Sequence, residues 1–207
     1  TPQIRELFAK LGSGGALTDS FLAAEMSIVG LIAAAYAIQA TMRLHSEEAT
    51  THAEAVLATG TSRVRWASSH IAIAVVGSAV LLVVAGASAG LAHAAQVRDW
   101  GQVGRVTAGA AVAIPAVWIC GGVVVLLFGF LPRLVWLAWA VLVFFLLLGE
   151  FGELLNLNQA VMDLSPFTHL PKLPGGAFTS TPLIVMALVA AVLVVVGLLE
   201  FRRRDVL

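Results

Sequence analysis

The chain has 207 residues, of which 59% are hydrophobic and only 12% are charged, and its mean hydropathy is +0.95. This composition lies far outside the range of soluble globular chains, and burial in a lipid bilayer accounts for it. The 12 basic and 12 acidic side chains cancel, so the basic surface that nucleic-acid binding requires is not indicated. A single cysteine, Cys120, excludes an intramolecular disulfide and a cysteine-clustered metal site. We therefore predict one all-α membrane domain over residues 1–207, with no metal site.

Five apolar stretches predict five transmembrane helices, because a helix needs roughly 20 apolar residues to cross a bilayer. We expect the spans at residues 21–42, 66–92, 106–131, 134–149 and 182–199. Pro115 lies near the middle of the third span and predicts a kink there, since proline lacks the backbone N–H. The fourth span is short. The segment after it, residues 150–180, contains a Pro- and Gly-rich stretch and predicts an external, partly re-entrant element.

Charge placement predicts the orientation. Three consecutive arginines, Arg202 to Arg204, follow the last span directly, and positive residues close to a span are retained in the cytoplasm. The C-terminus is therefore expected in the cytoplasm, on the same side as the loop between the first two spans. An odd number of spans then places the start of the chain outside. We expect an upstream span, and thus a piece of a longer polypeptide.

The loop between the first two spans predicts a short helix at about residues 45–59, ended by Gly60. Glu47 and Glu54 are seven residues apart and share one face of such a helix, while Leu57 belongs to an apolar patch. This arrangement suits docking onto a partner. An ordinary solvated loop helix explains the same pattern equally well.

The stretch from residue 47 to residue 70 carries a more specific pattern, the run Glu47-Glu48-Ala49, Ala53-Glu54, Val56-Leu57-Ala58-Thr59, Ser62-Arg63, Arg65-Trp66 and Ser69-His70. This run resembles permeases of ABC type 2 exporters. Together with Ser165-Pro166-Phe167 and the ending Phe201-Arg202-Arg203-Arg204-Asp205, it is similar to the actinobacterial branch of antibiotic or polyketide (tetronasin-like) multidrug exporters. The family often has Gly near Thr51 and Arg near His52, so this chain departs from its pattern there.

The resemblance implies a coupling helix that docks on a cytoplasmic ABC ATP-binding subunit. The coupling residues would be Glu47, Glu48, Glu54, Leu57 and Arg63. ATP and Mg would be bound and hydrolysed on that subunit, with no cofactor and no catalytic site in this chain. The 207 residues contain no Gly-x-x-x-x-Gly-Lys-Ser/Thr loop, which agrees with this expectation.

The same resemblance implies the rest of the assembly. The five spans would be the second to sixth of a six-helix permease half, with the missing helix upstream. Its partners would be two ATP-binding subunits, a second permease half or copy, membrane lipids and an amphipathic small molecule such as an antibiotic or another drug. Its location would be the cell membrane, and its activity multidrug efflux that confers antibiotic resistance.

Acidic side chains within or beside spans are candidates for a pathway or external gate, because a charge near mid-membrane costs about 2.5 kcal/mol or more. Three acids and one amide fall in this class: Glu25, Glu150, Glu153 and Asn156. Each has a simpler interpretation as well. Glu25 reaches the outer interface from near the end of its span, and Glu150 and Glu153 stabilise the re-entrant element through hydrogen bonds.

Gly86-Ala87-Ser88-Ala89-Gly90 formally matches the Gly-x-Ser-x-Gly nucleophile pattern, but that turn requires a strand followed by a helix. We expect these residues inside an apolar helix, with Gly86 and Gly90 allowing close helix packing. A serine-protease-like intramembrane enzyme is the alternative function. A non-transporting membrane scaffold or immunity protein is a third reading, and the sequence does not separate it from an exporter.

Overall fold

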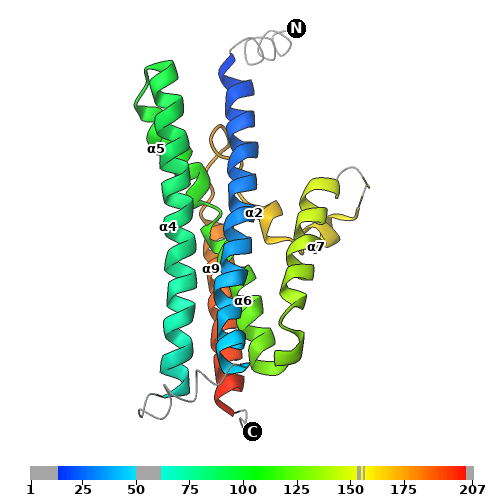
Figure 1. The fold of residues 1–207 in the computed structure, drawn as a ribbon. Coiled ribbons are helices and arrows are strands. Elements are labelled where there is room, and N and C mark those ends of the chain that lie inside the picture. The colour runs from blue at the N-terminus through cyan, green and yellow to red at the C-terminus, as the bar shows by residue number, and fades with distance from the viewer. Residues whose placement is uncertain (1–13, 50–61, 153–154, 156, 204–207) are drawn as a thin grey trace.

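The computed structural model describes residues 14–49, 62–152, 155 and 157–203, which form helices and turns with no strand (Figure 1). The all-α prediction is confirmed for this part of the chain. Its helices are α2 (Gly14–Ala49), α4 (Arg63–Val97), α5 (Gly101–Ala111), α6 (Ile114–Phe130), η1 (Pro132–Leu134), α7 (Leu137–Phe151), α8 (Gln159–Met162), η2 (Pro166–His169) and α9 (Thr181–Arg203).

Four helical segments are long and apolar enough to cross a membrane, namely Leu17–Glu48, Arg63–Val97, Gly101–Phe130 and Thr181–Arg203. Each exceeds the roughly 30 Å of a hydrocarbon core at about 1.5 Å per residue. The expected fourth span is the shorter helix α7, whose 15 residues reach only about 22 Å. The chain is therefore a multi-pass membrane protein with four helices of membrane length and one shorter apolar helix among the described residues.

Helix α2 is longer than the apolar stretch that predicted it. Its 36 residues extend from Gly14 to Ala49, so residues 45–49 continue α2 and do not begin a separate coupling helix. The reason is local, because the last turns contain neither Gly nor Pro and end in the good helix formers Glu47, Glu48 and Ala49. The remainder of the expected coupling helix, residues 50–59, lies outside the described residues.

The third membrane-length segment is interrupted between α5 and α6. Helix α5 ends at Ala111, and α6 starts at Ile114 with Pro115 in its first turn. Proline is tolerated there because the first N–H groups of a helix have no intrahelical acceptor. The break that Pro115 predicts thus lies immediately before it.

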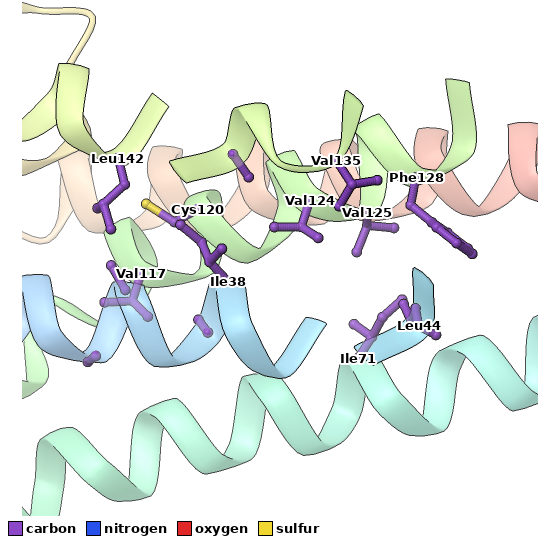
Figure 2. Packing of buried hydrophobic residues seen from close by; sticks show 14 of the residues in the cluster. Ile38, Leu44, Ile71, Val117, Cys120, Val124, Val125, Phe128, Val135 and Leu142 are labelled. Carbon is purple, nitrogen blue, oxygen red and sulfur yellow. The ribbon is translucent and has the colours of Figure 1, made fainter. Parts of the chain in front are cut away.

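Helix α6 lies at the centre of the bundle. It packs against α9 on one side and α2 on another, while α4 packs against α5 and α2. Figure 2 shows Ile38 of α2 close to Val117 and Cys120 of α6, and all three side chains are buried. In Figure 1 the end of α2, the start of α4 and the ends of α6 and α9 lie at the same end of the bundle.

The turn between α4 and α5 is held by Asp99. Helix α4 ends at Val97 and is followed by Arg98, whose φ of 53° is left-handed. The Asp99 carboxylate then accepts hydrogen bonds from the N–H of Gly101 (3.0 Å) and the side-chain amide of Gln102 (2.7 Å). The hydrogen bond from Gln102, then that from Gly101, lowers the pKa of Asp99 below its usual value. The charged form is therefore the one that stabilises the turn.

We expect Asp99→Asn to remove a pH-dependent part of the stability. A carboxylate with a lowered pKa in the folded state contributes its full stabilisation above the ordinary aspartate pKa of about 3.9 and loses it as the pH falls through the folded pKa. Thermal unfolding of both proteins in detergent between pH 6 and pH 3 measures this effect. The melting temperature of the wild type should exceed that of the variant at pH 6, and the gap should narrow toward pH 3. A difference in melting temperature that stays constant from pH 6 to pH 3 would contradict the stabilising role of the charged Asp99.

Candidate functional site

Four helices meet through a connected set of side chains at the shared end of the bundle. We call this set the four-helix junction. It consists of His45 and Glu47 of α2, Trp66 and His70 of α4, Phe128 of α6 and Phe201 of α9.

The first link of the junction joins the end of α2 to the start of α4. Nε2 of His70 lies 3.2 Å from Oε2 of Glu47, with the His70 side chain 18% exposed and that of Glu47 39% exposed. An imidazole N–H donates to a carboxylate at this distance, and protonation of the ring strengthens the pair. Partial exposure limits its contribution to stability. The pair links the end of α2 to the start of α4.

Aromatic contacts complete the junction. The ring of His70 lies edge-on to that of Trp66 at 5.3 Å, Trp66 lies 6.4 Å from Phe201, and Phe201 lies 4.9 Å from Phe128. Phe128 in turn meets His45 edge-on at 6.5 Å. These spacings are those of favourable ring pairs. The contacts therefore form a closed circuit that leaves α2 at Glu47 and returns to α2 at His45.

The interior of the junction is shielded from solvent. Trp66, Phe128 and Phe201 are 6%, 2% and 2% exposed. Nδ1 of His45 is buried and has no hydrogen-bond partner among the described residues. The rings at the centre of the junction are therefore closely packed, with little free volume around them.

Of the residues predicted to couple to an ATP-binding subunit, Glu47 belongs to this junction, and Glu48 and Arg63 belong to the two helix ends that meet there. Glu47 and Glu48 lie in the last turn of α2. Arg63 is the first residue of α4, which Ser62 caps by accepting a hydrogen bond from the N–H of Arg65 (3.3 Å). Glu54 and Leu57 lie outside the described residues.

Of the residues predicted for a pathway or gate, the structure describes Glu25 and the backbone of Glu150. Glu25 is half-buried on α2, and the 18 residues from Glu25 to Arg43 correspond to about 27 Å of helix without a charge between them. Since this length is close to the thickness of a hydrocarbon core, it favours the interface for Glu25. Glu150 belongs to the last turn of α7, and Glu153 and Asn156 lie outside the described residues.

A wide cavity of about 750 Å³, lined by both polar and apolar groups, lies toward the opposite end of α2. It lies between the first half of α2, the break between α5 and α6, and the loop at residues 170–176. Asp19 lines it and accepts a hydrogen bond from Arg105 of α5 at 2.9 Å. Lys172 lines it from the loop. Charges of both signs therefore border this cavity, and neither sign dominates.

An apolar cavity of about 230 Å³ lies inside the bundle, where α2, α4, α6 and α9 each contribute to its wall. Its polar groups are already paired, because Thr41 donates to the carbonyl of Ala37 (2.7 Å) and the Trp118 indole donates to the carbonyl of Val75 (3.2 Å). Such a lining is suited to apolar groups, since water needs several polar partners.

The Gly-x-Ser-x-Gly match lies within α4, as expected. Ser88 donates its hydroxyl to the carbonyl of Val84, one turn earlier (2.8 Å), and no strand-to-helix turn is present there. Gly86 and Gly90 face α5, where an added Cβ would lie 2.7 Å from Cβ of Ala110 and 2.9 Å from Cα of Val103, respectively. The two glycines thus lie at a close contact between helices.

Three features of the structure were not predicted from the sequence: the Glu47–His70 pair, the aromatic circuit, and the close approach of α6 to α9 at Gly122, Gly129 and Gly197. Only the close approach of α6 to α9 leaves a regular pattern in the sequence. Gly122 and Gly129 are seven residues apart, as are Ala190 and Gly197, so each set recurs on one helix face. The junction has no such pattern, because its members come from four helices.

These helices, with ends joined at one side and cavities between them, define a multi-pass α-helical membrane protein. Residues 1–202 match the family model described as the C-terminal domain of the multidrug efflux system permease Rv1217c, and the chain belongs to this family. Over 204 residues it is 43% identical to the multidrug efflux system permease protein Rv1217c of Mycobacterium tuberculosis (strain ATCC 25618 / H37Rv). The match covers 98% of this chain and 37% of that relative, so the chain spans about a third of the relative's length. The expected resemblance to multidrug permeases agrees with this family, and the tetronasin-like branch stays a prediction.

Proposed function

We propose that this chain forms part of the membrane-spanning permease of an ATP-driven ABC exporter of amphipathic compounds. The observation that carries the proposal is the 43% identity, along nearly the whole chain, to a protein named as a multidrug efflux permease. ATP and Mg bind and are hydrolysed on a separate ATP-binding subunit, present in two copies. A second permease half or copy completes the pathway.

The arrangement of the helices supports a coupling role for the end of the bundle that carries the four-helix junction. The end of α2 and the start of α4 flank the segment that contains Glu54 and Leu57, and the junction connects both helices to α6 and α9. A movement imposed on that segment by a nucleotide-binding subunit would reach four helices through this junction. In this proposal the end lies in the cytoplasm together with Arg202 and Arg203, which end α9.

The lining of the cavities supports the proposed substrate class. The apolar cavity accommodates rings or short chains, while the wide cavity at the other end of α2 also offers Asp19 and Lys172 to hydroxyl and charged groups. An amphipathic compound carries both kinds of group. The resemblance to the tetronasin-like branch favours antibiotics or polyketides within this class.

Charge reversal at two glutamates tests the coupling role. We expect the full-length permease with Glu47→Lys and Glu54→Lys, reconstituted with its ATP-binding subunit, to insert normally and to hydrolyse ATP, while export per ATP falls by about tenfold or more. The measurement is substrate flux into inverted vesicles beside phosphate release. Glu200→Lys is the matched control, since Glu200 lies at the same end of the bundle in an exposed pair with Arg203. Unchanged export by the double variant would exclude the coupling role. Purification of the permease under mild conditions without any associated ATP-binding subunit would count against the exporter function itself.

A further inference from the structure

The pair between Glu47 and His70 closes the contact circuit at the junction, and it is the only link of the circuit that connects α2 directly to α4. The other links run from α4 through α9 and α6 back to α2 by ring contacts. The pair instead brings an imidazole nitrogen and a carboxylate oxygen to 3.2 Å, an electrostatic contact that weakens as the two groups move apart.

We propose that His70 is a positioning residue that holds the start of α4 to the end of α2 through Glu47, so that the two helix ends move together during transport. This inference rests on the proposed function. His70 itself does not contact the ATP-binding subunit or the substrate in this proposal. It acts by keeping Glu47, and hence the last turn of α2, at a fixed place relative to α4.

The surroundings of His70 favour a positioning role over a purely structural one. Its side chain is 18% exposed and its ring lies edge-on against Trp66, which is 6% exposed. Packing against Trp66 fixes the plane of the imidazole, so Nε2 is directed at Glu47 with little freedom to turn away. Trp66 in turn contacts the ring of Phe201 of α9. A shift of α2 would therefore displace α4 and α9 through the side chain of His70.

The test uses the full-length permease with its ATP-binding subunit in vesicles, and it measures substrate exported per ATP hydrolysed. We expect His70→Ala to keep ATP hydrolysis and to lower this ratio by about fivefold or more. His70→Gln, whose amide N–H also donates to the carboxylate, should restore the ratio to within about twofold of the wild type. A residue that only fills space would not be rescued in this way, because Gln does not reproduce the ring.

A double-mutant cycle identifies the partner. If His70 acts through Glu47, the variant with Glu47→Ala and His70→Ala should show the ratio of the Glu47→Ala single variant and no further loss. His93→Ala is the matched control, since His93 lies on the same helix about 35 Å away, and it should leave the ratio unchanged. A wild-type ratio in His70→Ala, failure of His70→Gln to rescue, or additive losses in the double variant would each overturn the inference.

The same experiment separates this inference from the proposed function. A wild-type complex without ATP-dependent flux would overturn both. A wild-type complex with normal flux and an unaffected His70→Ala variant would overturn the positioning role alone, and the exporter would stand.

Discussion

Replacing Gly197 by alanine is expected to destabilise the protein, although the same change in a helix normally stabilises it. A Cβ at position 197 would lie 2.5 Å from the carbonyl oxygen of Val125 and 2.7 Å from its carbonyl carbon. These are backbone atoms of α6, which cannot turn aside as a side chain can. The helices α6 and α9 would have to separate, so we expect a loss of about 1–3 kcal/mol in the free energy of unfolding.

Gly104→Ala supplies the matched control for this prediction. Gly104 is an exposed residue of α5, and an added Cβ there would meet no atom within 4 Å. The change should raise the free energy of unfolding by about 0.5–1 kcal/mol, the usual gain for alanine over glycine in a helix. Denaturant unfolding in mixed micelles, followed by circular dichroism, measures both variants. Shifts of the same sign and size would show that α6 and α9 are not in backbone contact at Gly197.

The glycine contacts also illustrate what the sequence could predict. Gly86 and Gly90 are four residues apart, a spacing that is recognisable as a packing face, and the structure places them against α5. Gly129 and Gly197 belong to seven-residue repeats on two different helices. Their contact depends on which helices are neighbours, and hydropathy carries no information on that.

Helix existence was easier to predict than helix length. Apolar runs predicted all five apolar helical segments, because burial in lipid requires them. They did not predict that α2 extends from Gly14 to Ala49, since a helix continues beyond the bilayer wherever its backbone hydrogen bonds can continue. For the same reason the first turn of the expected coupling helix became the last turn of α2.

The four-helix junction could not be predicted, for a physical reason. Its members are distant in sequence, from His45 to Phe201, and each alone has an ordinary explanation in an apolar helix. Only the packing of α2, α4, α6 and α9 brings them together. In the sequence, His70 is part of the run that resembles the exporter permeases, and its partner Glu47 is expected to contact a different protein.

Phe201→Ala is the second change with a large expected effect. The Phe201 side chain is 2% exposed, and its ring lies 4.9 Å from that of Phe128 and 6.4 Å from that of Trp66. Truncation would leave a cavity at the centre of the junction, and buried Phe→Ala changes typically lower the free energy of unfolding by about 3–5 kcal/mol. Phe130→Ala is the control. Phe130 is 52% exposed near the end of α6, so its loss should be much smaller.

A third variant, Phe201→Leu, separates volume from ring contact. Leucine refills much of the cavity but offers no ring to Phe128 or Trp66. If packing volume dominates, Phe201→Leu should recover most of the stability that Phe201→Ala loses, because swaps of nearly conserved volume usually cost less than about 1.5 kcal/mol. If the ring contacts transmit movement between α4, α6 and α9, export per ATP should stay low in Phe201→Leu even though stability returns. Recovery of both quantities together would mean that Phe201 acts as a space-filling residue, and that the movement passes between these helices by another route.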